Sequence, residues 1–270
     1  MPPRHCGNLH IPPAVGGNFK TLTMKTIFLF LTIILFHINT YCQSNKLFEI
    51  NEHLVTDSTK IKTINDFTFQ DTTFFEDEKY VVRKTCSGEW GGSVWFKNKT
   101  TGIEYSCSAT CPVVINKIDG NYIVSATLAH LSGSSEIIEI ENPDSLDIFI
   151  MPKPSAKKGK IIYRYVGDDE SRSTKGTTML LDSIGVQTLA SFPYNGQLYH
   201  VITDFDKTFL TQVENGRFVT LDTISNASIW TYEPEVIKST NGHFVVFFNN
   251  HKTRGYLDIH GKSIDIFRLK

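Results

Sequence analysis

The chain repeats one short pattern about every 40 residues: a tight turn followed by an apolar run rich in β-branched and aromatic residues. The turns are expected near Glu78, Gly120, Gly159, Gly196 and Gly242, and glycine occupies four of these five positions. Glycine adopts the positive φ that hairpin turns need. The runs that follow the turns read YVVRK, YIVSA, KIIYRYV, LYHVI and HFVVFF. Such runs are typical of strands covered on both faces.

The pattern is clearest between Pro112 and Leu146. This stretch predicts three consecutive strands, at Val113–Lys117, Tyr122–Leu131 and Glu136–Glu141. The Asp119–Gly120 pair between the first two is a typical two-residue hairpin turn. We therefore expect a meander of neighbouring antiparallel strands here.

A β-rich unit of about 40 residues is the signature of a β-propeller blade. Five such units account for residues 43–270, so the sequence predicts one all-β domain, a five-bladed propeller. A possible strand at Leu47–Ile50 lies in the segment expected to close the ring between the first and last blades. A β-sandwich built of hairpins is the alternative, because the same strand spacing allows it.

The segment Met24–Cys42 has the organisation of a bacterial signal peptide. Lys25 gives a positive start, Ile27–Phe36 forms the apolar core, and Thr40 and Cys42 are the small residues before a cleavage site. The core is too short to span a bilayer. We expect translation to start at Met24, residues 1–23 to be a gene-model extension, and the exported protein to keep no transmembrane segment.

Export predicts a periplasmic, cell-surface or secreted location. Lipoprotein anchoring at Cys42 is the competing interpretation, but that modification needs a small residue before the cysteine, and Tyr41 is bulky. The formal net charge of −1 argues against a nucleic-acid partner, which requires a basic face.

Three cysteines remain after signal removal: Cys86, Cys107 and Cys111. An oxidising compartment favours a disulfide among them. A strand at Tyr80–Cys86 next to a hairpin could bring Cys86 near Cys107 or near Cys111, and the spacing does not choose between them. A metal site is the rival interpretation, but it lacks a fourth ligand, since the nearest histidine is His130. The sequence predicts no metal and no cofactor.

Two stretches, MKTIFLFLTIILFHINTYCQ and CSGEWGGSVWFKNKTTGIEYSCSATCPVV, carry a resemblance. The chain resembles exported all-β, propeller-like proteins of unknown role from the Bacteroidota. The resemblance implies export and an all-β domain, and it brings no known activity.

The best candidates for binding are tryptophans. Trp90 and Trp95 flank glycines in CSGEWGGSVWF, where a backbone can approach a ligand closely and an indole can stack on a sugar or aromatic ring. Trp230 and Tyr232 in SIWTYEP offer the same chemistry. The structural alternative is that the glycines shape a turn and the tryptophans cap the core.

Asp204 and Asp206 form a possible carboxylate pair, because alternate residues of an extended segment point to one face. Such a pair could bind calcium or act as acid and base, although it often simply ends a strand. The sequence contains no H-E-x-x-H, no G-x-S-x-G and no phosphate-binding loop. No catalytic residue is therefore assigned.

Two function classes follow. The first is an exported binding module for an envelope or extracellular glycan or protein, which needs no catalytic residue. The second is a glycoside hydrolase whose carboxylates gather at the mouth of the propeller, since such sites leave no local motif. The binding module is the preferred hypothesis, because no catalytic pattern is found.

Overall fold

The computed structural model describes residues 46–270, except 69–72, 155, 158, 162 and 163. The expected signal peptide at 24–42 and the expected extension at 1–23 lie outside the described residues. The described chain is all-β, with nineteen strands and four short 3-10 turns, and Leu47–Lys270 forms one structural unit. No helix within this part is long and apolar enough to cross a membrane.

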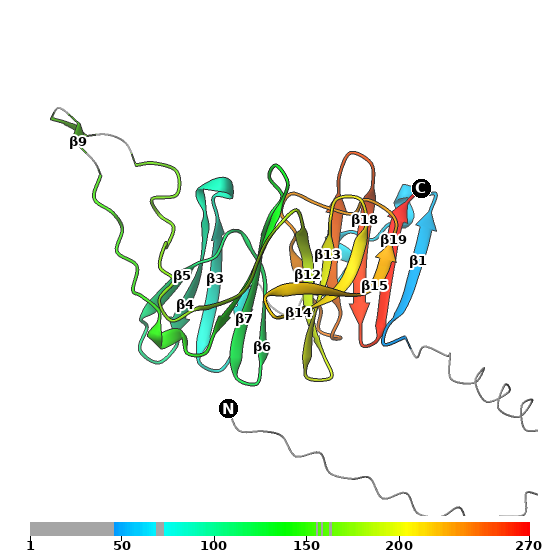
Figure 1. The fold of residues 1–270 in the computed structure, drawn as a ribbon, viewed down its shortest axis with the longest axis horizontal. Coiled ribbons are helices and arrows are strands. Elements are labelled where there is room, and N and C mark those ends of the chain that lie inside the picture. The colour runs from blue at the N-terminus through cyan, green and yellow to red at the C-terminus, as the bar shows by residue number, and fades with distance from the viewer. Residues whose placement is uncertain (1–45, 69–72, 155, 158, 162–163) are drawn as a thin grey trace, which may run out of the picture. The chain divides into compact units, whose positions relative to one another are not determined.

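Four sheets of four or five strands and one two-stranded hairpin make up the structure (Figure 1). The first sheet comprises β2 (Phe75–Glu76), β3 (Tyr80–Cys86), β4 (Gly92–Asn98) and β5 (Glu104–Ser108). The second comprises β6 (Pro112–Ile118), β7 (Asn121–Leu128), β8 (Ser134–Ile140) and β11 (Thr178–Ile184). The third comprises β12 (Gln187–Tyr194), β13 (Gln197–Thr203), β14 (Thr208–Glu214) and β15 (Arg217–Ser225). The fourth comprises β16 (Val236–Lys238), β17 (Phe244–Asn249), β18 (Arg254–His260), β19 (Ser263–Leu269) and β1 (Glu49–Val55).

Two-residue turns set the hairpins. Asp119–Gly120, Asn195–Gly196 and Asn215–Gly216 each hold both residues at positive φ, between 49° and 90°. This geometry matches the right-handed twist of the flanking strands, and asparagine, aspartate and glycine adopt it most readily. The hairpin expected at Asp119–Gly120 and the three-strand meander around it are confirmed.

The third of the five expected units differs from the other four. The segment around Gly159 forms only the two-stranded hairpin β9 (Ala156–Lys157) and β10 (Lys160–Ile161). Figure 1 shows β9 away from the strands of the four sheets. The next long strand, β11, instead pairs with β8 and completes the second sheet. The third expected unit therefore does not form a sheet of its own. It is a long excursion of the chain between β8 and β11.

The N-terminal strand joins the last sheet, as expected from the sequence. β1 pairs with β19, in parallel, from Glu49 opposite Ser263 to Val55 opposite Leu269. The aromatic side chains His53 and Phe267 stack across this pair, with ring centroids 4.4 Å apart. The two ends of the described chain thus lie in one sheet (Figure 1).

Apolar clusters lie between successive sheets. One joins the first and second sheets around Phe96 and Val124, and a smaller one joins the second and third around Ile137. The largest joins the third and fourth sheets around Phe192 and Leu257. The middle strands β7 and β13 have mostly buried residues and half of β17 is buried, which explains their continuous apolar sequences.

A buried polar chain crosses from the second sheet to the third. The hydroxyl oxygen of Ser191 lies 2.7 Å from both Ser125 Oγ and His200 Nδ1. Burial lowers the pKa of His200 to about 3, because the charged imidazolium would lose its hydration there. His200 is therefore neutral in the folded protein at physiological pH.

This burial predicts acid sensitivity. The folded state binds the His200 proton only below about pH 3, whereas the unfolded chain binds it below about pH 6.5. The stability that the neutral imidazole contributes is complete above pH 6.5 and is lost as the pH falls toward 3. We expect the free energy of unfolding to be about 2 kcal/mol lower at pH 5 than at pH 7 in urea titrations. H200Q, which cannot titrate, should flatten this slope, and an unchanged slope would contradict the assignment.

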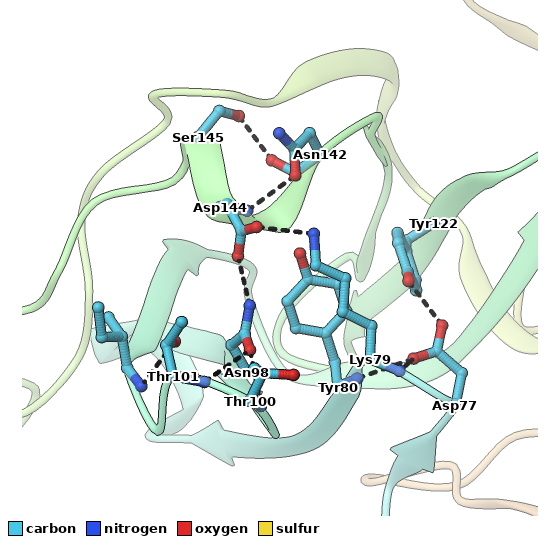
Figure 2. A network of polar contacts seen from close by, with 11 residues as sticks. Asp77, Lys79, Tyr80, Asn98, Thr100, Thr101, Tyr122, Asn142, Asp144 and Ser145 are labelled. Atoms are coloured by element: carbon cyan, nitrogen blue, oxygen red, sulfur yellow. Dashed lines mark hydrogen bonds and ion pairs between the residues drawn. The ribbon is translucent and has the colours of Figure 1, made fainter.

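A second polar network fastens the turns of the first sheet (Figure 2). Asp144 accepts hydrogen bonds from Lys79 Nζ at 2.7 Å and from Asn98 Nδ2 at 3.1 Å. Asp77 accepts from the Tyr122 hydroxyl and the Lys117 ammonium, as well as from two backbone amides. Burial alone would raise the pKa of Asp77, but these hydrogen bonds together lower it to about 2. Both carboxylates are thus engaged in holding the fold.

Candidate binding surface formed by the interstrand loops

Loops from all four sheets contact one another at one end of the strands. The loop after β3 meets the loop after β7 where Glu89 Oε2 lies 3.4 Å from His130 Nδ1. The ring of Phe205, after β13, lies against the backbone of Gly133, after β7. Asn250, after β17, donates hydrogen bonds to the carbonyls of Ser228 and Trp230, which precede β16. We call this end of the strands the loop end.

An apolar surface, the loop patch, lies at this end and is formed by Leu131, Ile184, Phe205, Trp230 and Tyr232. Leu131 is 93% exposed, Ile184 78% and Tyr232 63%. The Trp230 and Tyr232 ring centroids are 5.1 Å apart, and Phe205 is 6.0 Å from Trp230. Gly185, next to Ile184, donates its backbone N–H to Gly133. Exposed apolar side chains that gather on neighbouring loops mark interaction sites in soluble proteins.

The loop that carries Trp230 and Tyr232 is held firmly. The Gln187 side-chain amide donates to the Thr231 carbonyl at 2.5 Å and accepts from the Thr231 amide. Ser228 donates its hydroxyl to the Phe205 carbonyl. The backbone that carries the aromatic pair is therefore held in place, which reduces the entropy lost on binding.

Trp90 lies on a separate part of the loop end and is 52% exposed. It ends the 3-10 turn Gly88–Trp90, which Ser87 separates from the disulfide-bonded Cys86. Its carbonyl accepts a hydrogen bond from Arg172 Nη2 at 3.3 Å. A Cβ on Gly167 would lie 2.7 Å from the same carbonyl oxygen, so glycine permits this close approach. Two residues of the excursion between β8 and β11, Gly167 and Arg172, thus pack against the backbone of Trp90.

A cavity of about 290 Å³ lies beside Trp90, within this excursion. Phe149, Ile150, Asp168 and Arg172 are among its lining residues. It combines apolar side chains with three acidic residues, Asp147, Asp168 and Glu170, and one basic residue, Arg172, and so adds a small mixed pocket near the Trp90 backbone.

Glu170 anchors the excursion to the first sheet. Its buried carboxylate accepts hydrogen bonds from three hydroxyls: Thr85 at 2.5 Å, Ser87 at 2.7 Å and Ser93 at 2.7 Å. The Ser93 hydroxyl also accepts from the backbone amide of Ser171. Three donors satisfy a carboxylate that would otherwise be costly to bury.

Removing this carboxylate should loosen the Trp90 region. We expect E170A to lower the free energy of unfolding by about 2 kcal/mol, since the buried Ser93 hydroxyl and the partly buried hydroxyls of Thr85 and Ser87 lose their acceptor. Urea titration measures the loss, and proteolysis should show faster cleavage within residues 147–177. E170Q keeps one acceptor oxygen and should lose less; equal losses for the two variants would contradict the role of the carboxylate.

The two other candidate sites predicted from the sequence, Trp95 and the Asp204/Asp206 pair, make contacts that stabilise the fold. Trp95 is buried, packs edge-on against Phe149 with centroids 5.0 Å apart, and lies under the Arg83 guanidinium at 4.1 Å. Asp204 and Asp206 are both exposed in the turn between β13 and β14. Asp204 accepts the backbone amides of Asp206 and Lys207, so its carboxylate caps its own turn.

The disulfide joins Cys86 to Cys111 and ties the end of β3 to the start of β6. Of the two pairings that the spacing allowed, this is the one formed, because Cys107 points into the core between the first two sheets. Burial raises the pKa of the Cys107 thiol to about 12. A disulfide is compatible with the expected export.

The sequence reasoning missed several residues of this surface. Leu131 and Ile184 each lie next to a glycine-containing turn. A large aliphatic residue at a turn is a sequence signal for an exposed apolar side chain, and it could have identified both residues. Glu170 and Arg172 act by contacting the first sheet and the Trp90 turn. These contacts join residues far apart in the chain, and no local sequence pattern predicts them.

Comparison with known proteins adds no assignment: no protein-family model and no curated protein matches the chain. Among the described residues, no group of three or more histidine, cysteine, aspartate or glutamate side chains is placed to hold a metal ion.

Proposed function

We propose that the protein is an exported binding module that recognises an envelope or extracellular partner through the loop end. The carrying observation is the loop patch, where Leu131, Ile184 and Tyr232 are exposed and Tyr232 packs beside Trp230. Interfaces are enriched in such aromatic side chains at their centres. The two aliphatic residues favour a protein partner, whereas the separate indole of Trp90 suits stacking on a sugar.

We also propose that the four sheets are blades of one propeller-like arrangement. Contacts between the first strands of different sheets support it. Asn116 in β6 donates to the Ser191 carbonyl in β12 at 3.0 Å. Lys238 in β16 donates to the Ile115 carbonyl in β6 at 2.7 Å and lies 5.5 Å from the Phe75 ring in β2. Propellers place the first strand of each blade at the common axis.

Binding to isolated cell envelopes of the producing organism tests the function. We expect the purified chain 43–270 to bind saturably, and Y232A and L131S each to weaken binding about tenfold or more, because residues at an interface centre contribute about 1–2 kcal/mol or more. Protease treatment of the envelopes should abolish binding if the partner is a protein, whereas periodate should do so if it is a glycan.

E78Q, at an exposed residue of the β2–β3 turn, is the control and should bind as the wild type does. Circular dichroism and the thermal midpoint should be unchanged in all three variants. Binding that is unaffected by both Y232A and L131S would contradict a role for the loop patch.

One observation favours glycoside hydrolysis as a second candidate. Glu136 in β8 stands directly opposite Asp182 in β11, and cross-strand neighbours lie within reach of each other. Burial, and to a lesser degree Asp182, raise the pKa of Glu136. Two neighbouring carboxyl groups, one of them with a pKa raised by burial, are the arrangement of a glycosidase acid and its partner.

A hydrolysis screen with nitrophenyl glycosides tests this alternative. If the pair is catalytic, E136Q should reduce turnover at least a hundredfold while leaving the thermal midpoint near that of the wild type. Turnover that persists in E136Q would rule out this pair, and loss of turnover in both Y232A and E136Q would link hydrolysis to the loop end.

A further inference from the structure

A second cavity, of about 560 Å³, lies between the second and third sheets, at the end opposite the loop end. Its mouth is flanked by the hairpin turns Asp119–Gly120 and Asn215–Gly216. The volume is in the range of sites that hold small molecules. Nothing in the proposed binding role uses this cavity.

The inner wall of this cavity is apolar. Ile123, Ile137, Leu198 and Val213 line it, and they belong to the cluster between the two sheets. His200 is a further lining residue and is only 1% exposed; its Nδ1 lies 2.7 Å from Ser191 Oγ.

The polar lining is acidic. Asp119, Glu139 and Glu214 contribute three carboxylates, and neither lysine nor arginine is among the described lining residues. Glu139 accepts one hydrogen bond, from Asn121 at 2.8 Å, and none of the three carboxylates forms an ion pair with another described residue. A cation that entered would therefore meet unneutralised charge beside apolar walls.

We propose that this cavity binds a small organic amine with a compact apolar body. The apolar walls would take the body, and the ammonium would donate to Glu139. Carboxylates accept hydrogen bonds and donate none, so the acidic lining matches a donor-only cationic group. An anion would be repelled by the same carboxylates.

Three compounds of nearly equal size test the charge preference by calorimetry: 2-phenylethylamine, 2-phenylethanol and 3-phenylpropanoate. We expect the amine to bind at least tenfold more tightly than the alcohol, because a charge-assisted hydrogen bond is stronger than one between neutral groups. The carboxylate compound should not bind. Equal binding of all three compounds, or no binding of the amine, would overturn the proposal.

Variants of the lining residues test whether the amine binds in this cavity. E139Q keeps the size of the side chain and the amide contact with Asn121, and should weaken amine binding about fivefold or more. L198W and V213F should each block the cavity, and two filling variants are used because one of them could fail to fold. E78Q is the matched control on another turn. Amine binding that survives both filling variants in their folded form would overturn the site.

The proposal is independent of the loop end. Y232A should leave amine binding unchanged, and E139Q should leave envelope binding unchanged. A failure of either site can therefore be told apart from a failure of the other.

Discussion

Replacing Gly255 with alanine should destabilise the protein by about 3 kcal/mol or more. Gly255 lies in β18, opposite Arg268 of β19. A Cβ at this position would run into the Phe267 carbonyl and would lie 2.8 Å from Arg268 Cα and 2.9 Å from the Phe248 ring. The first two are backbone atoms of the paired strand, so relief requires moving β19 away from β18. Since β19 also holds β1, the damage should spread to the N-terminal strand.

Urea titration of G255A measures this loss, and limited proteolysis should show early cleavage near residues 46–60. G242A is the matched control. Gly242 has φ of 76° and open space around a Cβ, so its alanine variant should lose only about 1–2 kcal/mol. Equal losses in the two variants would contradict the importance of the close β18–β19 approach.

Removing the disulfide should have a comparable effect. The bond between Cys86 and Cys111 closes a loop with a sequence separation of 25 residues. Loops of this length predict a stabilisation of about 3 kcal/mol through the lower entropy of the unfolded chain. We expect C86S/C111S to lose about this much in urea titrations, and Trp90 fluorescence to become more solvent-like because the bond fixes the adjacent turn.

The wild type under reducing conditions should lose the same amount as the double variant. C107A is the control for altering a cysteine in the same region, and it should keep its sensitivity to reductant. A wild type that is equally stable with and without reductant would contradict a structural role for this disulfide.

Local patterns carried most of the fold prediction. The Asp119–Gly120 turn and the alternation of apolar runs identified the meander of the second sheet, because turn chemistry and side-chain period are encoded in neighbouring residues. The third expected unit shows the limit of such reasoning. Its sequence has the right turn and an apolar run, but the neighbouring β8 edge takes β11 instead. Pairing between distant strands is decided by packing, and spacing does not reveal it.

The candidate site was only partly accessible from the sequence. Trp90, Trp230 and Tyr232 were identified as aromatic residues in loops, and these loops do lie at one end of the strands. Trp95 was grouped with them because a tryptophan beside glycines looks the same whether it is buried or exposed. The buried groups Glu170, His200 and Lys238 carry no local pattern, since each depends on partners more than 8 residues away in the chain.

Site-specific photo-crosslinking tests the central claim most directly. A photoreactive phenylalanine analogue at position 232, in the protein expressed by its own organism, would report what lies against the loop patch. The account predicts one discrete adduct from position 232, none from the control position 78, and loss of that adduct when L131S is added. Adducts from position 78 alone, or no adduct from position 232 while the protein is bound to the envelope, would contradict recognition at the loop end.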